Sequence, residues 1–167
     1  MKRKRGNFKI IPFLFGGLKI NTYLCIIKND KNMKKTIFLG GTCNDSLWRD
    51  ALIPQLPNAD CFNPVVPNWN DEAYQKELKA REISDVCLYV ITPKMTGVYS
   101  IAEVIDDSNK RPGKTVFHYM NEDTVNGETV TFNKARLNSL KACGKMVRAN
   151  GGYWAETMED LITYLNK

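Results

Sequence analysis

An unbroken apolar run, Val86 to Ile91, is the feature that most limits how this chain can fold. The carboxylate of Asp85 precedes the run, and a loop with Pro93 and Gly97 follows it. A strand with one solvated face alternates apolar and polar residues, whereas a continuous apolar run is typical of a strand covered on both faces of a parallel sheet. We therefore expect residues 86–91 to be the central strand of an open α/β sheet, whose following loop borders a ligand crevice.

From about Met33 onward, segments with the pattern of strands alternate with segments with the pattern of helices. We expect strands at residues 36–39, 59–62, 86–91, 115–119 and 145–148, helices at 45–53, 71–83, 132–143 and 155–165, and loops at 63–70 and 121–128. A further helix carries Val98, Ile101, Ala102 and Ile105, which share one face at i, i+3, i+4 and i+7. This alternation predicts an α/β fold with a doubly wound, five-stranded parallel sheet of the flavodoxin or Rossmann type, of order 2-1-3-4-5, with helices on both faces.

The positive charge of the chain is concentrated at one end. The formal net charge is +6, but residues 1–35 hold ten Lys or Arg and one acid, which leaves about −3 for the remainder. We therefore expect no basic groove on the folded body, and nucleic acid could bind only through this arm. We interpret residues 1–32 as a basic extension that is disordered or arises from an upstream start site, with an accessory arm as the alternative, and residues 33–167 as one domain.

The five cysteines are scattered and show no CxxC spacing, a pattern typical of reduced thiols rather than of disulfides or a zinc site. The single histidine, His118, excludes a metal site rich in histidine. No segment reaches the roughly 18 apolar residues that a membrane span needs. We therefore expect a cytoplasmic protein with no bound metal and no membrane contact.

The loops that follow parallel strands share one edge of the sheet, where open α/β folds bind ligands. The candidate binding residues at this edge are Gly40, Gly41, Thr42, Asn44, Asn63, Trp69, Thr96, Gly97 and Tyr99. The two adjacent glycines would let a ligand approach the backbone closely, or would serve only a tight turn. Trp69 lies in a loop and could stack on a base, whereas Trp48 lies on an apolar helix face and is expected in the core.

Three acids, Glu103, Asp85 and Glu77, are the candidate catalytic residues, because paired carboxylates at a crevice suggest acid/base or nucleophilic chemistry. Each also has a structural explanation. The sequence from Ser100 to Glu103 matches a helix capping box, Asp85 could simply end the preceding helix, and Glu77 could be a solvated helix residue.

Several motifs carry a resemblance: Thr36-Ile-Phe-Leu-Gly-Gly-Thr42, Trp48-Arg49, Phe62-Asn63-Pro64, Trp69, Ser84-Asp85 and Gly97-Val-Tyr-Ser-Ile-Ala-Glu103. Over about residues 36–117 the chain resembles the nucleoside 2-deoxyribosyltransferase superfamily, in particular its 2-deoxyribosyltransferase-like branch. The resemblance implies that Glu103 is a nucleophile that attacks C1′ of a 2′-deoxynucleoside or nucleotide. The resulting deoxyribosyl-enzyme ester would pass to another base or to water.

The same resemblance implies that Glu77 or Asp85 protonates or hydrogen-bonds the leaving base. It also implies that no cofactor is needed and that the chain assembles as a homo-oligomer. Two positions depart from the well-studied members: Phe38 stands where they have a tyrosine, and Gly97 where they have a sugar-binding aspartate. Two hypotheses therefore remain: a deoxyribosyltransferase or N-glycoside hydrolase, and a non-catalytic nucleotide-binding or sensing module that uses the same crevice.

Overall fold

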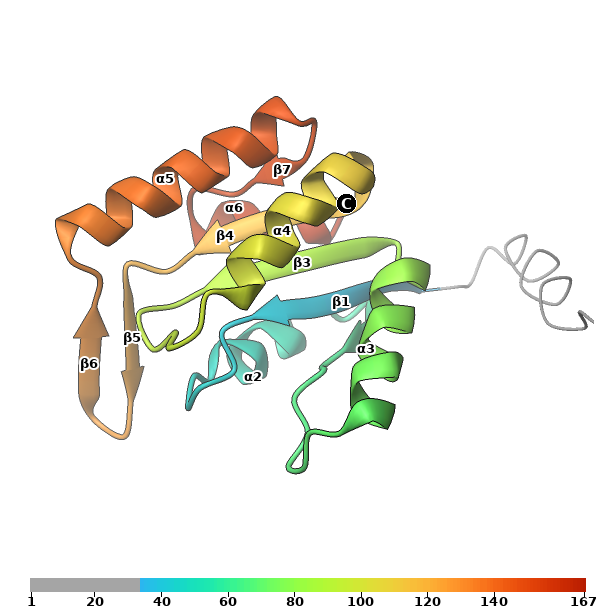
Figure 1. Ribbon diagram of the computed structural model, residues 1–167, viewed down its shortest axis with the longest axis horizontal. Helices are drawn as coiled ribbons and strands as arrows, with labels where there is room; N and C mark the ends of the chain where they lie inside the picture. The colour runs from blue at the N-terminus through green and yellow to red at the C-terminus, as the bar shows by residue number, and fades with distance from the viewer. Residues whose placement is uncertain (1–33) are drawn as a thin grey trace, which may run out of the picture. The chain divides into compact units, whose positions relative to one another are not determined.

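Five strands form one parallel sheet, in the order β2-β1-β3-β4-β7 (Figure 1). The strands are β1 (Lys35–Gly41), β2 (Ala59–Phe62), β3 (Val86–Ile91), β4 (Thr115–Tyr119) and β7 (Tyr153–Trp154). This computed structural model describes residues 34–167, so the interpretation of residues 1–32 lies outside the described residues. The α/β class, the parallel sheet and its spatial order are confirmed.

Helices cover both faces of the sheet. On one face lie α3 (Asp71–Ile83), α4 (Tyr99–Lys110) and α5 (Lys134–Ala149), and on the other lie α2 (Trp48–Leu52), the 3₁₀ turn η1 (Ile53–Gln55) and α6 (Met158–Leu165). A second 3₁₀ turn, η2 (Pro112–Lys114), leads into β4. Trp48 is buried in the core, as expected. None of the helices in residues 34–167 has the length and apolar character that a bilayer crossing requires.

The central strand shows why its sequence is apolar without interruption. Every residue of β3 is buried. Val86, Leu88 and Val90 pack in the core beneath α2 and α6, while the alternate residues pack in the core beneath α3, α4 and α5. Successive side chains of a strand point to opposite faces, so a strand between two cores needs apolar side chains at every position.

The predicted fifth strand is wrong. Residues 145–148 belong to α5, and the fifth strand of the sheet is the short β7. Leu140, Gly144 and Val147 are the buried positions of α5 and continue one helical face through the predicted strand. Gly144 lets the helix approach the sheet, because a Cβ at this position would lie 2.4 Å from the Trp154 ring.

The expected loop at residues 121–128 is also wrong. Residues 122–131 form an antiparallel hairpin of β5 (Glu122–Val125) and β6 (Glu128–Thr131). The turn residues Asn126 and Gly127 both have positive φ, 54° and 81°. Asn-Gly is the preferred pair for a two-residue hairpin turn, so the signal was present in the sequence.

The first helix is shorter than expected, and α6 begins at Met158 after its cap Thr157 rather than at residue 155.

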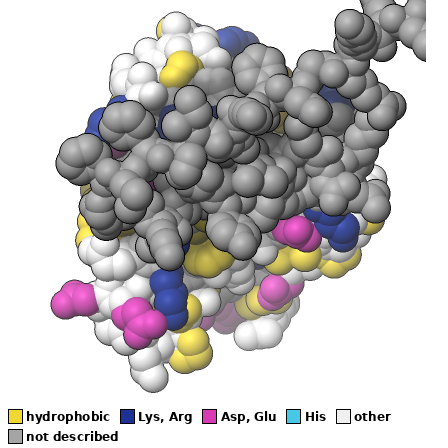
Figure 2. Space-filling model, turned by 90° about the vertical axis from the view of Figure 1, so that its right-hand side faces the viewer, with side chains coloured by type: hydrophobic (Ala, Val, Ile, Leu, Met, Phe, Trp, Pro, Cys, Tyr) yellow, Lys and Arg dark blue, Asp and Glu magenta, His cyan; other side chains and the backbone are white. Residues whose placement is uncertain are grey.

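Charged side chains of both signs occur on one face of the protein. In Figure 2, acidic, basic and apolar side chains are interspersed over the part of this face that residues 34–167 form. That part of the face therefore shows no continuous surface of one charge.

Candidate functional site

A cavity of about 360 Å³ opens at the end of β1, between the loop 63–70 and the helices α3 and α4. This is the carboxyl edge of the parallel sheet, where the sequence predicted a ligand crevice. Six of the predicted site residues line the cavity: Gly40, Gly41, Trp69, Glu77, Tyr99 and Glu103. Seven further lining residues were missed: Cys43, Arg49, Pro64, Val65, Val66, Tyr74 and Ser100.

Asp85 does not reach this cavity. Its Oδ2 accepts hydrogen bonds from the backbone N and the hydroxyl of Thr36, at 3.0 and 2.9 Å. These contacts lie at the amino end of β3, and the length of that strand separates them from the cavity edge by roughly 20 Å. A residue that precedes a parallel strand lies at the opposite edge from the loop that follows it. The expectation that Asp85 and Glu103 border one crevice therefore conflicts with the structure.

The other predicted binding residues lie outside the cavity lining. The Thr42 hydroxyl accepts a hydrogen bond from the backbone N of Thr92 at 2.9 Å, and the Asn44 side chain accepts one from the Thr96 hydroxyl at 3.2 Å. Both contacts join the loop after β1 to the loop after β3. Asn63 accepts a bond from the backbone N of Val65 at 3.1 Å and lines a smaller neighbouring cavity.

The three glycines of the predicted site differ in whether a larger side chain would fit at their positions. A Cβ at Gly40 would lie 2.7 Å from the Tyr89 ring, and one at Gly41 would lie 2.0 Å from the Val90 carbonyl oxygen. Gly41 also has a φ of 114°, which favours glycine. By contrast, a Cβ at Gly97 would meet nothing within 4 Å. Close packing on β3 thus requires the first two glycines, and it also brings their backbone to the cavity wall.

Glu103 lies in the second turn of α4, and only 7% of its surface is exposed. Its Oε1 accepts a hydrogen bond from Arg81 Nη1 at 2.7 Å. Helix α4 begins after Val98 without a side-chain cap, so the capping-box interpretation of Glu103 is wrong. Within residues 34–167, the second oxygen, Oε2, makes no hydrogen bond.

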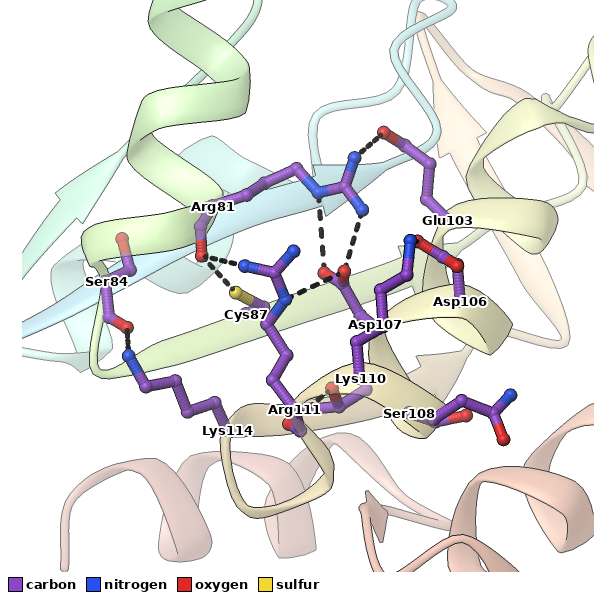
Figure 3. Close-up of polar contacts among 12 residues, drawn as sticks. Arg81, Ser84, Cys87, Glu103, Asp106, Asp107, Ser108, Lys110, Arg111 and Lys114 are labelled. Carbon is purple, nitrogen blue, oxygen red and sulfur yellow. Dashed lines mark hydrogen bonds and ion pairs between the residues drawn. The ribbon is translucent and has the colours of Figure 1, made fainter.

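Arg81, which the sequence patterns did not single out, connects Glu103 to a buried polar cluster (Figure 3). Arg81 donates to both oxygens of Asp107: Nη2 lies 2.8 Å from Oδ1, and Nε lies 3.4 Å from Oδ2. The Tyr89 hydroxyl donates to Asp107, and Arg111 Nε lies 3.1 Å from it. The sequence spacing was consistent with this cluster. Glu103 and Asp107 are four residues apart on α4, as are Glu77 and Arg81 on α3, so each pair shares a helix face.

Two acids of the cavity have raised pKa values. Burial raises the pKa of Glu103 to about 7; Arg81 opposes this shift, and the negative charges of Glu77 and Asp107 add to it. Burial also raises the pKa of Glu77, against the opposing effects of Arg81 and Arg49. Perturbed acids that share a cavity are typical of sites that transfer protons.

Part of the cavity lining is aromatic, and a buried arginine also borders the cavity. Trp69 is 57% exposed and lies against Tyr74, with ring centroids 6.3 Å apart, while Tyr99 is exposed at the start of α4. Arg49 donates to the carbonyls of Leu39 and Thr42, at 3.0 and 2.7 Å, and so holds the turn after β1. An aromatic wall beside polar groups suits a planar ligand such as a nucleobase.

A second, larger hollow lies apart from these acids. It measures about 850 Å³, runs between α4 and α5, and has a mainly apolar lining that includes Thr96 among the predicted site residues. Within residues 34–167, no group of three or more His, Cys, Asp or Glu side chains is arranged to hold a metal ion.

Comparison with protein families gives a match to part of the chain. The family model described as "Nucleoside 2-deoxyribosyltransferase like" matches residues 34–118, about half of the chain. This range runs from β1 to β4 and contains Glu77, Arg81 and Glu103. No curated protein matches the chain.

Proposed function

The chain belongs to the nucleoside 2-deoxyribosyltransferase-like family, and we propose that it transfers or hydrolyses the N-glycosidic bond of a 2′-deoxynucleoside or nucleotide, with Glu103 as the nucleophile. The observation that carries this proposal is the Glu103 carboxylate at the cavity. One of its oxygens is held by Arg81, and the other has no hydrogen-bond partner within residues 34–167.

The first half of the reaction forms a covalent ester. A lone pair on Glu103 Oε2 attacks C1′, the C1′–N bond breaks, and its electron pair goes to the departing base. Glu77 lines the same cavity, and burial raises its pKa, which favours the protonated form that can donate to the base. In the second half, another base or water attacks C1′, releases Glu103 as a carboxylate, and returns a proton to Glu77. This double displacement follows the logic of retaining glycosidases.

The base would lie against the aromatic wall. Trp69, Tyr74 and Tyr99 offer faces on which a purine or pyrimidine ring can stack, and Gly40 and Gly41 border the same cavity. The cavity volume of about 360 Å³ is within the range of small-molecule sites. Stacking tolerates any base, so base preference would depend on the polar groups that face the ring edge.

A binding or sensing module without turnover is the second candidate, and one observation favours it. Phe38, which stands where the characterised enzymes have a tyrosine, is fully buried between the Phe62 and Tyr89 rings and does not line the cavity. It therefore brings no hydroxyl to Glu103. The module would hold a nucleoside or nucleotide stoichiometrically and release it unchanged.

Chromatography of the base released from a panel of deoxynucleosides and deoxynucleotides separates the two candidates. We expect release by the wild-type protein, loss of release in Glu103→Gln, and full release in Glu156→Gln, which removes an acid from an exposed ion pair with Arg148. Adding a second base distinguishes transfer from hydrolysis. A folded protein that binds a panel member but releases no base would refute glycosyl transfer and support the binding module.

A further inference from the structure

Asp107 holds the Arg81 side chain in one orientation. Asp107 is fully buried, and both its oxygens accept from Arg81, with Tyr89 and Arg111 as additional donors. A guanidinium that forks onto a carboxylate has a fixed plane. Its remaining group, Nη1, is thereby directed at Glu103 Oε1 at 2.7 Å (Figure 3).

The bond from Arg81 also gives the two oxygens of Glu103 different roles. Oε1 is occupied by Arg81, so the oxygen available for reaction is Oε2, and the cavity borders the same carboxylate. When an ester forms through Oε2, Oε1 becomes its carbonyl oxygen and stays within reach of Arg81. The charge on Glu103 disappears in the first half of the reaction and returns in the second.

We propose that Arg81 is a positioning residue for Glu103, and that its bond to Oε1 acts mainly in the second half of the reaction, when the deoxyribosyl group leaves. This inference rests on the proposed function. A hydrogen bond from a cation to a carboxylate is stronger than one to an ester carbonyl. Arg81 therefore opposes the loss of charge as the C1′–O bond forms. It favours the return of charge as that bond breaks and its electron pair goes back to Glu103.

Removing the guanidinium should therefore make the ester accumulate. Arg81→Gln keeps a hydrogen-bonding side chain and leaves Asp107 paired with Arg111 and Tyr89. We expect its steady-state rate to fall about tenfold or more, while the first turnover still releases base. Intact-mass measurement during turnover should then show protein that carries one deoxyribosyl group, at a higher fraction than in the wild type. The matched control Arg148→Gln breaks an exposed ion pair outside the cavity and should leave both measurements unchanged.

The pH profile gives a second readout that a purely structural role would not change. The charged and titratable groups near Glu103 include Arg81 and Glu77 from α3, Tyr89 from β3, Arg49 from α2, and Tyr99 and Asp107 from α4. Among them only Arg81 favours the ionised form of Glu103. The rising limb of the first-turnover rate should therefore move to higher pH in Arg81→Gln, and Arg81→Lys should partly restore it.

The outcomes separate this inference from the proposed function. Accumulated ester together with the shifted limb supports the role of Arg81. Equal losses of first-turnover and steady-state rates, without ester, refute it while glycosyl transfer stands. Absence of Glu103-dependent release from the wild type refutes both. If Arg81→Gln fails to fold, Arg81→Lys serves instead. Lysine keeps the charge but loses the fork to Asp107 that directs the cation at Oε1, so part of the ester should still accumulate. A fraction of ester equal to that of the wild type refutes the inference.

Discussion

The buried carboxyl of Glu103 should make the protein less stable in the same pH range in which it becomes a nucleophile. Two effects compete at this group, because burial raises its pKa and the Arg81 guanidinium lowers it, and burial is the larger. The pKa lies at about 7 in the folded protein, against an ordinary value of 4.5. At 1.36 kcal/mol per pH unit, this difference corresponds to about 3 kcal/mol of folding free energy.

The sign follows from proton binding. Between pH 4.5 and about 7 the folded protein binds a proton at Glu103 that the unfolded chain has already released. Stability is therefore lost as the pH rises through this window, and the contribution of Glu103 is fully present only below pH 4.5. Turnover changes in the opposite direction, because the ionised carboxylate is the attacking form, and the rate should rise with pH through about 7.

The assay is urea unfolding of the wild type and of Glu103→Gln at pH values from 4 to 9. Subtracting one free energy of unfolding from the other cancels the titration of groups that the two proteins share. We expect the wild type to lose about 3 kcal/mol relative to the variant between pH 4.5 and 7.5, and the difference to be constant above pH 8. Glu156→Gln should show a flat difference of under about 1 kcal/mol, because exposed ion pairs contribute little. A flat Glu103 difference would mean that Arg81 balances burial, and a difference that grows with pH would mean that Arg81 outweighs it; either result would refute the reasoning.

Three further predictions concern single residues. Gly41→Ala should lower the free energy of unfolding by more than about 2 kcal/mol in the same urea assay, because of its φ of 114° and its contact with β3, while Gly97→Ala should change it by less than about 0.5 kcal/mol. Trp69→Ala should raise the KM for a deoxynucleoside about tenfold or more with a smaller effect on kcat, because it removes a stacking face; an unchanged KM would place the base elsewhere. Asp85→Asn should reduce stability by about 1 kcal/mol through weaker bonds to Thr36 yet keep kcat within twofold, and a large loss of kcat would show that Asp85 has a catalytic part.

Local patterns in the sequence were sufficient for the architecture. The uninterrupted run at β3 indicated a strand covered on both faces, and the alternation of strands and helices indicated a parallel sheet. The error at residues 145–148 shows the limit of such patterns. A short β-branched or apolar stretch within α5 is compatible with either structure, and the contact between Gly144 and Trp154 that selects the helix joins residues ten apart in sequence.

The sequence alone determined which edge of the sheet holds the cavity, because strand direction follows from the alternation of strands and helices. For Glu103 it left two interpretations open, a helix cap and a residue at the crevice. Only the tertiary structure decided what surrounds Glu103. Arg81 comes from a different helix and was not visible as a partner until α3 and α4 were packed on the same face of the sheet. The position of Asp85, by contrast, follows from strand direction, since a residue that precedes a parallel strand lies at the edge opposite the loop that follows it. Burial and charge act through space, and it is these two that raise the pKa of Glu103 and orient its oxygens.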